Sequence, residues 1–406
     1  MNINENLIEC INNLLELFNT IEFASIALFF VIVYHILLLI TKDRKYIKRF
    51  KENYDPDSIM LNDLNELPHI TIIIPAWNEG KEFKDCLYSI EKLSYPHINV
   101  IVNAGGNEET IKIANSYKQF EKFTILEQKR GAGKFIRGKG KIRAINECLN
   151  YVSKGIVFFF DADCYITDEI IIRMLYPIVN GNEAVVTGAG SRPLKALENI
   201  DFVQYVLISR IGRFKIIRYN DIMLAGANTC MKYEVLKDIG KFEEDRVVAT
   251  DISRGYDIIS KGYKIFCLTD YRSAIYTDYP KNFRELHEQR KRYLSNSLIN
   301  SVKNRKIIPV MKYIFLLIIS FYILISPIFL FFNTGLFIIG LLMVFFFYLK
   351  NIRRILIFKS IYKRGLYPKF NKSLFIKMVY FIIIELFINV LTIFSLNSVR
   401  KRLKNK

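Results

Sequence analysis

The chain has 406 residues, and its 58 lysines and arginines against 39 aspartates and glutamates give a net charge of +19. Its six cysteines are widely spaced without a C-x-x-C pair, and no H-E-x-x-H occurs, so neither a disulfide framework nor a zinc site is expected. No nucleic-acid-binding module accompanies the positive charge, so we expect no nucleic-acid partner. Apolar residues concentrate at the two ends, which favours a membrane-facing role for the basic excess.

The N-terminal segment, residues 1–65, contains one uncharged apolar run at about 23–40. Roughly 20 apolar residues are enough for a helix to cross a hydrocarbon core about 30 Å thick. The residues before this run are acidic, and those after it are basic: Lys42, Arg44, Lys45, Lys48 and Arg49. This order argues against a cleaved signal peptide. By the positive-inside rule it predicts a transmembrane helix that is followed by cytoplasmic chain.

Residues 66–305 are expected to form a soluble domain on the cytoplasmic side. Short apolar runs alternate there with amphipathic, helix-like stretches, and the runs of strand type are 70–74, 99–102, 123–126 and 156–160. Strands that are apolar on both faces and alternate with helices predict an α/β fold with a parallel sheet covered on both sides. In such sheets ligands bind beyond the carboxyl ends of the strands.

Polar residues follow three of these strands and should converge on one edge of the sheet: Pro75 to Glu79, Asn103 to Thr110, and Asp161-Ala162-Asp163. Two carboxylates spaced two residues apart can share a divalent cation that also takes diphosphate oxygens. A solvated turn is the alternative, because D-x-D is common by chance. The position of Asp161 and Asp163 directly after an apolar strand favours a site for Mg²⁺ or Mn²⁺.

Three further segments could carry chemistry. Residues 129–141 are rich in glycine and cations, which suits phosphate binding, although a basic loop without a ligand is the alternative. Asp251 could cap a helix or could deprotonate a sugar hydroxyl, and the residues leave both readings open. Gln289, Arg292 and Tyr293 lie on a basic helix that could also be a positive-inside flank.

The C-terminal region, residues 306–406, is expected to lie in the membrane. Its uncharged stretch is too long for one span and contains Asn333-Thr334-Gly335, so we predict a hairpin of two spans at about 313–332 and 335–349. A later stretch, about 378–396, carries only Glu385 and predicts a fourth span. Buried core helices are the alternative. The expected location is therefore the cell membrane, with several passes and contact with membrane lipids.

In this order the motifs resemble those of family 2 glycosyltransferases with the GT-A fold, in particular the membrane-bound hyaluronan, chitin, cellulose and poly-N-acetylglucosamine synthases. The resemblance covers roughly residues 68–300. The matching residues are Ile74 to Glu79 for I-P-A-Y-N-E, Lys141, Ala144 and Asn146 for G-K-x-x-A-x-N, Asp161 to Asp163 for D-x-D, Ala249-Thr250-Asp251 for T-E-D, and Gln289, Arg292 and Tyr293 for Q-x-x-R-W.

The resemblance implies a GT-A, Rossmann-like domain plus transmembrane helices, and an inverting transfer from a nucleoside-diphosphate sugar. It implies that Asp251 is the catalytic base and that Asp161 and Asp163 hold Mg²⁺ or Mn²⁺. A UDP-sugar is the expected donor, but Asn103-Ala104-Gly105-Gly106 replaces the family's D-D-G-S and leaves the base open. The implied donor-binding residues are Pro75, Asn78, Glu79, Asn103, Lys141, Asn146 and Asp161, and those at the acceptor and the diphosphate are Gln289, Arg292 and Tyr293.

The basic helix with Gln289 lies shortly before the predicted span at 313–332, so the acceptor should be a lipid-linked saccharide or a surface polysaccharide at the membrane face. A processive polysaccharide synthase and a polyprenyl-phosphate glycosyltransferase are alternatives within the fold. A transporter subunit and an inactive scaffold are alternatives of another class. The large soluble domain argues against the first of these, and the joint presence of Asp161, Asp163 and Asp251 argues against the second.

Overall fold

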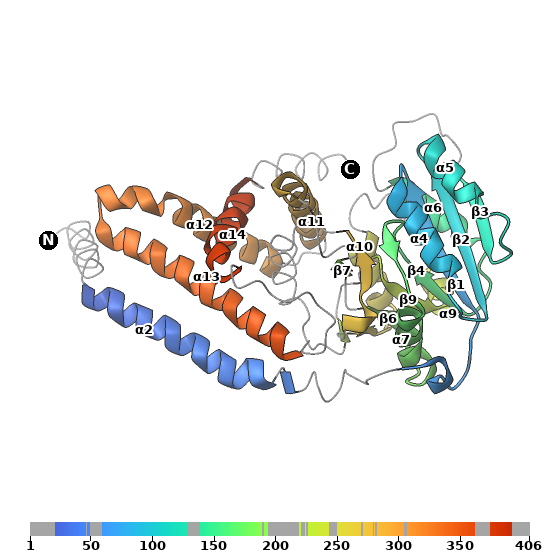
Figure 1. Cartoon of the computed structure of the whole chain (residues 1–406), viewed down its shortest axis with the longest axis horizontal. Coiled ribbons are helices and arrows are strands. Elements are labelled where there is room, and N and C mark those ends of the chain that lie inside the picture. The colour runs from blue at the N-terminus through green and yellow to red at the C-terminus, as the bar shows by residue number, and fades with distance from the viewer. Residues whose placement is uncertain are drawn as a thin grey trace. The chain divides into compact units, whose positions relative to one another are not determined.

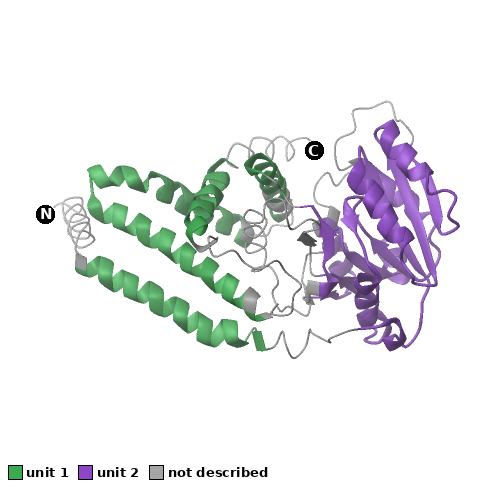
Figure 2. Cartoon of the chain, in the orientation of Figure 1, with its two compact units in different colours: residues 1–49, 197–213, 280–406 green, residues 50–196, 214–279 purple. Residues whose placement is uncertain are grey.

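The computed structural model describes residues 21–45, 47–48, 59–128, 139–188, 191–193, 219–220, 224, 226–242, 250–268, 271–278, 280, 282–303, 307–361 and 374–391. The chain forms two compact units, coloured separately in Figure 2. The sheet unit comprises residues 50–196 and 214–279, and the helical unit comprises residues 1–49, 197–213 and 280–406. The soluble domain was predicted to extend to residue 305, and the division into compact units begins the last segment of the helical unit at Pro280, with α11 (Phe283–Lys303) in contact with α12 (Ile307–Ile325).

Eight strands of the sheet unit form one sheet: β1 (Ile70–Trp77), β2 (Ile98–Gly105), β3 (Phe123–Glu127), β4 (Ile156–Phe159), β6 (Val185–Thr187), β8 (Tyr219–Asn220), β9 (Thr229–Lys232) and β10 (Ile265–Cys267). Their order is β3-β2-β1-β4-β9-β6-β10-β8 (Figure 1). The four strands that the apolar runs predicted, β1 to β4, are mutually parallel. The sheet is nevertheless mixed, because β9 runs antiparallel to both β4 and β6.

Both faces of the sheet are buried, as the apolar runs predicted. On β1, Ile72 and Ile74 belong to one core and Ile73 belongs to the other, and all three are fully buried. Burial of one such side chain contributes on the order of 1.5–3 kcal/mol. The helices of this unit are α4 (Lys81–Glu91), α5 (Glu108–Asn115), α6 (Lys139–Leu149), α7 (Asp168–Val179), α9 (Tyr233–Ile239) and α10 (Thr250–Ser260). Residues of α4 and α7 share the first core, and residues of α6, α9 and α10 share the second.

A smaller sheet of three strands lies in the same unit. Its strands, in the order β5-β11-β7, are β5 (Cys164–Tyr165), β11 (Ile275–Thr277) and β7 (Ser191–Pro193). Because β5 begins directly after Asp163, the turn that carries Asp161 and Asp163 is held between β4 of the large sheet and β5 of the small one.

The helical unit contains α2 (Ile21–Leu38) with the π-helical turn η1 (Leu39–Asp43), α11 (Phe283–Lys303), α12 (Ile307–Ile325) with the 3-10 turn η4 (Ser326–Phe331), α13 (Thr334–Ile361) and α14 (Leu374–Leu391). Three described segments are long and apolar enough to cross a membrane: Glu22–Asp43, Val310–Phe331 and Thr334–Ile357. They coincide with the first three predicted spans. The fourth overlaps α14, but residues 392–396 lie outside the described part, so that crossing stays a prediction.

The predicted turn at Asn333 separates η4 from α13. The Asn333 side chain accepts a hydrogen bond from the backbone N–H of Leu336 over 3.0 Å and so caps α13. Further along the same helix, Gly340 lies close to Ser326. A Cβ added at Gly340 would stand only 2.3 Å from the Ser326 Oγ. A small residue at this point lets the two segments approach closely, as is common between helices in membranes.

A buried ion pair joins the first and third apolar helices. The guanidinium of Arg353 on α13 donates from Nε and a terminal nitrogen to the two carboxylate oxygens of Asp43, over 2.6 and 2.8 Å. The second terminal nitrogen lies 3.2 Å from Nδ1 of His35 on α2. His35 and Asp43 are both buried. This two-point geometry fixes the register of α2 on α13.

We expect Asp43→Asn to destabilise the helical unit by about 1–3 kcal/mol, because the charge of Arg353 would remain buried without its counterion. Thermal unfolding of the full chain in detergent measures this effect. The double variant Asp43→Asn/Arg353→Gln is the control, since it removes both charges and should cost less than the single variant. Equal stability of the Asp43→Asn variant and the unchanged protein would contradict the prediction.

Candidate active site

The loops after β1 and β2 meet at the carboxyl edge of the sheet. Asn78 directly follows β1 and has a left-handed φ of 56°, a conformation that asparagine adopts more readily than most residues. Its backbone N–H donates to the carbonyl of Gly105 at the end of β2 over 3.1 Å. The convergence of these two loops, which the strand ends predicted, is therefore present.

Glu79 is held in place by the loop after β2. Its backbone N–H donates to the hydroxyl of Thr110 over 2.7 Å, and the backbone N–H of Thr110 donates to the Asn107 side chain over 2.7 Å. Burial raises the pKa of Glu79, and the negative charges of Asp163 and Asp161 raise it further. The pKa of Glu79, in the loop after β1, therefore responds to the charges of Asp161 and Asp163 in the loop after β4.

Lys141 and Asp161 form an ion pair at this edge. The Lys141 ammonium, on α6, donates a hydrogen bond to Oδ1 of Asp161. Burial by itself would lower the pKa of Lys141, but the charges of Asp161 and Asp251 and the hydrogen bond to Asp161 outweigh it and raise the pKa above its usual range. The ammonium of Lys141 therefore has favourable charge interactions with both Asp161 and Asp251.

Asp163 is the more exposed partner of the D-x-D pair, although the surrounding protein still removes part of the water from its carboxylate. Burial and the neighbouring charge of Asp161 raise its pKa, whereas Lys141 lowers it. The thiol of Cys164 donates to Oδ1 of Asp163 over 3.7 Å, and the thiol of Cys86 donates to the backbone carbonyl of Asp161 over 3.8 Å. Burial raises the pKa of both thiols. Two protonated thiols therefore line the protein side of the carboxylate pair.

The donor set fits a hard divalent cation that arrives with its substrate. Asp161 and Asp163 offer carboxylate oxygens, and after burial the charge of Asp161 is the second cause that raises the pKa of Asp163. Within the described part of the chain, no group of three or more histidine, cysteine or acidic side chains is arranged to hold an ion. Magnesium commonly takes one or two protein carboxylates and completes its shell with substrate phosphates, so two carboxylates are sufficient.

Asp251 lies inside the first turn of α10, which begins at Thr250. This placement does not match an N-cap, which precedes the first helical residue. Burial is the main cause of its raised pKa, the charge of Asp161 adds to it, and Lys141 opposes it. The Asp251 carboxylate therefore faces the same ammonium as Asp161, which brings the predicted base and the predicted metal ligands to one place.

Two family models match the chain, and between them they include Lys141, Asp161, Asp163 and Asp251. Residues 71–240 match the model described as Glycosyl transferase family 2, and residues 195–351 match Glycosyl transferase family group 2. The chain belongs to the family 2 glycosyltransferases. The first match contains Lys141, Asp161 and Asp163, and the second contains Asp251 together with α11, α12 and most of α13.

Curated relatives of this family 2 glycosyltransferase come from bacteria. "Probable glycosyltransferase YdaM" of Bacillus subtilis (strain 168) is 24% identical over 261 residues, which cover 61% of this chain and 59% of that protein. "Poly-beta-1,6-N-acetyl-D-glucosamine synthase" of Staphylococcus epidermidis is 26% identical over 214 residues, which cover 51% of this chain and 50% of that protein. The chain thus spans about half the length of the curated relatives that it matches.

A solved structure supports the fold of the glycosyltransferase. The mannosyltransferase PcManGT from Pyrobaculum calidifontis, in complex with GDP-Man and Mn2+, matches with a TM-score of 0.51 and 17% identity, covering 94% of this chain and 99% of that one. Together with the family models, this likeness confirms the GT-A fold that the motifs predicted.

Two predicted donor-binding residues of the glycosyltransferase make other contacts. The amide nitrogen of Asn103, which is fully buried, donates to the Ala144 carbonyl over 3.2 Å and to a carboxylate oxygen of Glu147 over 2.7 Å. The Asn146 amide exchanges two hydrogen bonds with the backbone of Phe242. In the described structure both residues anchor α6, and their contact with the donor stays a prediction. Pro75 lies within β1, opposite Asn103.

The predicted acceptor residues of the glycosyltransferase lie in the helical unit. Gln289, Arg292 and Tyr293 are on α11, where the guanidinium of Arg292 lies 5.6 Å from the centre of the Tyr293 ring. Their contact with the acceptor and the diphosphate stays a prediction. Of the basic stretch 129–141, residues 129–138 lie outside the described part, so only its end, with Lys141, contributes to the site as described.

Gly226 is a site residue that the sequence analysis missed. A Cβ at this position would stand 2.0 Å from both Cγ and Oδ2 of Asp251 and 2.1 Å from Oδ1. The space that a side chain would fill is therefore occupied by the carboxylate. The segment Ala225-Gly226-Ala227 offered a signal, because small residues permit such an approach, but its partner is 25 positions away and could not be read from the sequence.

We expect Gly226→Ala to lower turnover by about 10-fold, because the new methyl group must displace the Asp251 carboxylate and small misplacements of reacting groups are costly. Gly262→Ala is the control. Gly262 has a φ of +84° and open space around its Cα, so alanine there costs on the order of 1–2 kcal/mol in backbone strain without touching the carboxylates. Turnover and thermal stability of both variants check this. Full activity of Gly226→Ala would contradict it.

Proposed function

We propose that this chain is an inverting glycosyltransferase, which moves a sugar from a nucleoside-diphosphate sugar to a lipid-linked saccharide or a surface polysaccharide at the cytoplasmic face of the membrane. The observation that carries the proposal is the position of Lys141, whose ammonium binds Asp161 and is also coupled to Asp251. One cation thereby links the predicted diphosphate end of the site to the predicted base.

Asp251 is the general base of the proposed reaction. Its carboxylate takes the proton of an acceptor hydroxyl while the hydroxyl oxygen forms a bond to the anomeric carbon of the donor sugar. The bond from that carbon to the diphosphate oxygen breaks, and the diphosphate leaves with the bonding electrons. Because the oxygen enters opposite the leaving group in a single displacement, the configuration at the anomeric carbon is inverted.

The diphosphate end of the site is negatively charged and needs cations. Asp161 and Asp163 would hold Mg²⁺ or Mn²⁺, which supplies positive charge to the leaving diphosphate when it is bound. Lys141 adds a fixed ammonium of the chain itself at the same end. The neighbouring carboxyl of Glu79, whose pKa is raised by burial and by the two aspartates, can keep its proton more readily than an ordinary glutamate and so adds less repulsion toward an arriving anion.

The membrane location of the proposed reaction is supported by the three apolar helices of the helical unit. Few of their side chains are buried within the protein, so their apolar surfaces suit contact with lipid. The basic residues that follow α2, with Lys350, Arg353 and Arg354 near the end of α13, favour a cytoplasmic position for these helix ends. An acceptor carried by a lipid would be available at that face.

A screen of nucleotide sugars tests the proposal. The full chain in membrane vesicles is incubated with a panel of UDP- and GDP-sugars and Mn²⁺ or Mg²⁺, and the released nucleoside diphosphate is measured. GDP-sugars belong in the panel because the fold neighbour is in complex with GDP-Man and Mn2+. We expect release from one donor class and a loss of release in the Asp251→Asn variant. If folded protein releases no nucleoside diphosphate from any donor, the proposal is wrong.

A processive polysaccharide synthase is the second candidate, and the relatives named as poly-beta-1,6-N-acetyl-D-glucosamine synthases favour it. The polar residue Asn389 of α14 favours the first proposal, because its amide donates to the hydroxyl of Ser320 on α12 over 3.3 Å and so contributes to helix packing. Product analysis separates the two candidates. Long polymers made by the purified chain without an added lipid acceptor would decide for the processive synthase.

A further inference from the structure

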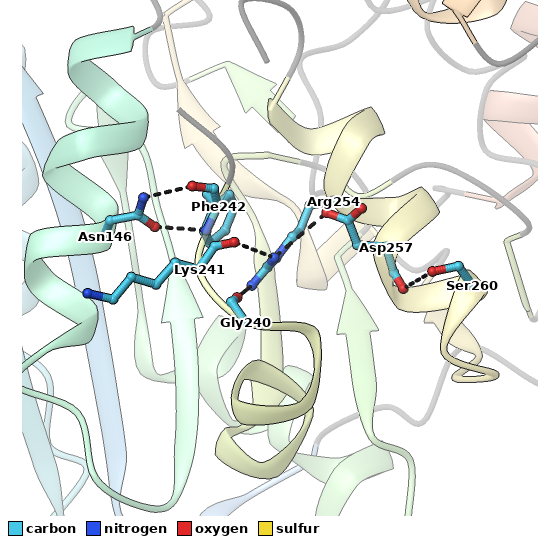
Figure 3. A network of polar contacts seen from close by, with 7 residues as sticks. All are labelled: Asn146, Gly240, Lys241, Phe242, Arg254, Asp257 and Ser260. Atoms are coloured by element: carbon cyan, nitrogen blue, oxygen red, sulfur yellow. Dashed lines mark hydrogen bonds and ion pairs between the residues drawn. The ribbon is translucent and has the colours of Figure 1, made fainter. Parts of the chain in front are cut away.

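Helix α6, which carries Lys141, is tied to the segment that leads toward α10. The Asn146 amide nitrogen donates to the Phe242 carbonyl over 2.8 Å, and the backbone N–H of Phe242 donates back to the Asn146 amide oxygen over 2.8 Å (Figure 3). Asn146 is 6% exposed. Such a two-point contact between a side chain and the backbone fixes orientation as well as distance.

Helix α10, which carries Asp251, is tied to the same segment from the other side. Arg254, one turn after Asp251, donates to the carbonyls of Gly240 and Lys241 over 2.5 and 3.5 Å, and its guanidinium lies 4.1 Å from the centre of the Phe242 ring (Figure 3). Arg254 is 1% exposed. A buried guanidinium that serves two carbonyls and an aromatic face cannot be replaced by lysine without loss of contacts.

Phe242 also touches the strand that leads to the metal ligands. Its ring packs edge-on against Phe159, the last residue of β4, with 5.9 Å between the ring centres. Phe159 stands two residues before Asp161. Phe242 thus contacts α6 and α10, which carry Lys141 and Asp251, and also β4, which is followed by Asp161.

We propose that Asn146 and Arg254 are positioning residues, which hold α6 and α10 together through Gly240–Phe242 and thereby keep the Asp251 carboxylate beside Lys141. This inference rests on the proposed function, in which Asp251 is the base. It reassigns Asn146 from donor binding to the alignment of the base. We call the contacts of Asn146 and Arg254 with Gly240–Phe242 the clamp. It keeps Lys141 near Asp251, whose anion is destabilised by burial and by Asp161 and stabilised by Lys141.

Hydrogen–deuterium exchange of the full chain in detergent micelles tests the clamp without any substrate. We expect Asn146→Ala to speed amide exchange across residues 250–260. Asn180→Ala is the matched control, because Asn180 makes the same pair of backbone contacts at the end of α7, donating to the Asp63 carbonyl over 2.8 Å and accepting from the Asn65 N–H over 3.3 Å. Equal exchange in α10 of the two variants overturns the proposal.

Arg254→Lys tests the other half of the clamp. It keeps the charge but loses the planar contact with Phe242, and it should also speed exchange in α10. The matched control is Arg173→Lys on α7, where an arginine with 2% side-chain exposure pairs with Glu169 at 3.5 Å. If Arg254→Lys leaves the exchange of α10 unchanged, or speeds it no more than Arg173→Lys, the clamp does not hold α10.

Kinetics then separate positioning from donor binding. We expect Asn146→Ala to lower turnover by about 10-fold through misplacement of the base, with the Kd for UDP-N-acetylglucosamine and GDP-mannose unchanged. In an Asp251→Asn background the same substitution should have no further effect on turnover. A weakened Kd with unchanged turnover would return Asn146 to donor binding. Full activity of Asp251→Asn would defeat the proposed base instead, whereas unchanged exchange in α10 defeats only the clamp.

Discussion

Replacement of Asp251 by asparagine is expected to lower turnover by about 100-fold or more, because the amide keeps the shape of the carboxylate but cannot accept a proton. Release of nucleoside diphosphate at saturating donor and acceptor measures this effect. Binding of the donor alone should be preserved, since asparagine fits the space that Gly226 leaves open. Unchanged turnover in the folded variant would show that Asp251 serves only the first turn of α10.

The pH dependence offers an independent check on the same residue. Burial raises the pKa of Asp251, Asp161 adds to the rise, and Lys141 opposes it. A base works only when deprotonated, so turnover should fall as the pH drops through this raised pKa, at a higher pH than for an ordinary aspartate. The control is Asp238→Asn on α9, an exposed carboxylate that pairs with Lys261 at 3.5 Å; it should leave the profile unchanged.

Replacement of Asp163 by alanine is expected to have the largest effect, a loss of about 1,000-fold or more. Without this carboxylate the proposed divalent cation would lose one of its two protein ligands, and the leaving diphosphate would lose several kcal/mol of charge stabilisation. Activity should also vanish in excess chelator and return on addition of Mg²⁺ or Mn²⁺. Full activity in chelator would contradict the assignment of a metal to Asp161 and Asp163.

A matched control for Asp163→Ala lies five residues further along the chain. Asp168 begins α7, and its carboxylate accepts the backbone N–H of Ser94 over 2.9 Å. Asp168→Ala should reduce thermal stability without changing the concentration of Mn²⁺ that gives half-maximal activity. Asp161→Asn, by contrast, should raise that concentration and also free Lys141 from its ion pair. The comparison separates loss of the metal from loss of structure.

The edge of the sheet could be predicted from the sequence because its signals are local. Each strand from β1 to β4 is a short apolar run, and the polar residues that follow it mark the carboxyl end. Parallel strands place such ends side by side, so the sequence alone could predict that Asn78, Asp161 and Asp163 lie at the same edge of the sheet. The antiparallel insertion of β9 could not be foreseen, because its pairing with β4 depends on residues about seventy positions away.

The hydrogen-bond partners of Asn103 and Asn146 could not be predicted for the same physical reason. An asparagine amide can form hydrogen bonds with any backbone group beside it. For Asn146 the partner is Phe242, which is 96 residues further along the chain. The motif identified the position but not the partner. The contact of the basic helix α11 with the apolar helix α12 could not be predicted either, because it depends on packing between two helices.

The ion pair between Asp43 and Arg353 has a consequence for biosynthesis. Its partners are 310 positions apart, and the sheet unit is encoded between them. At about 5–20 residues per second, a ribosome needs roughly 15–60 s to pass from one to the other. During that interval Asp43 lacks its counterion, while every strand of the sheet unit is synthesised before Arg353. The packing of α2 on α13 through this ion pair can therefore form only after the whole sheet unit has been synthesised.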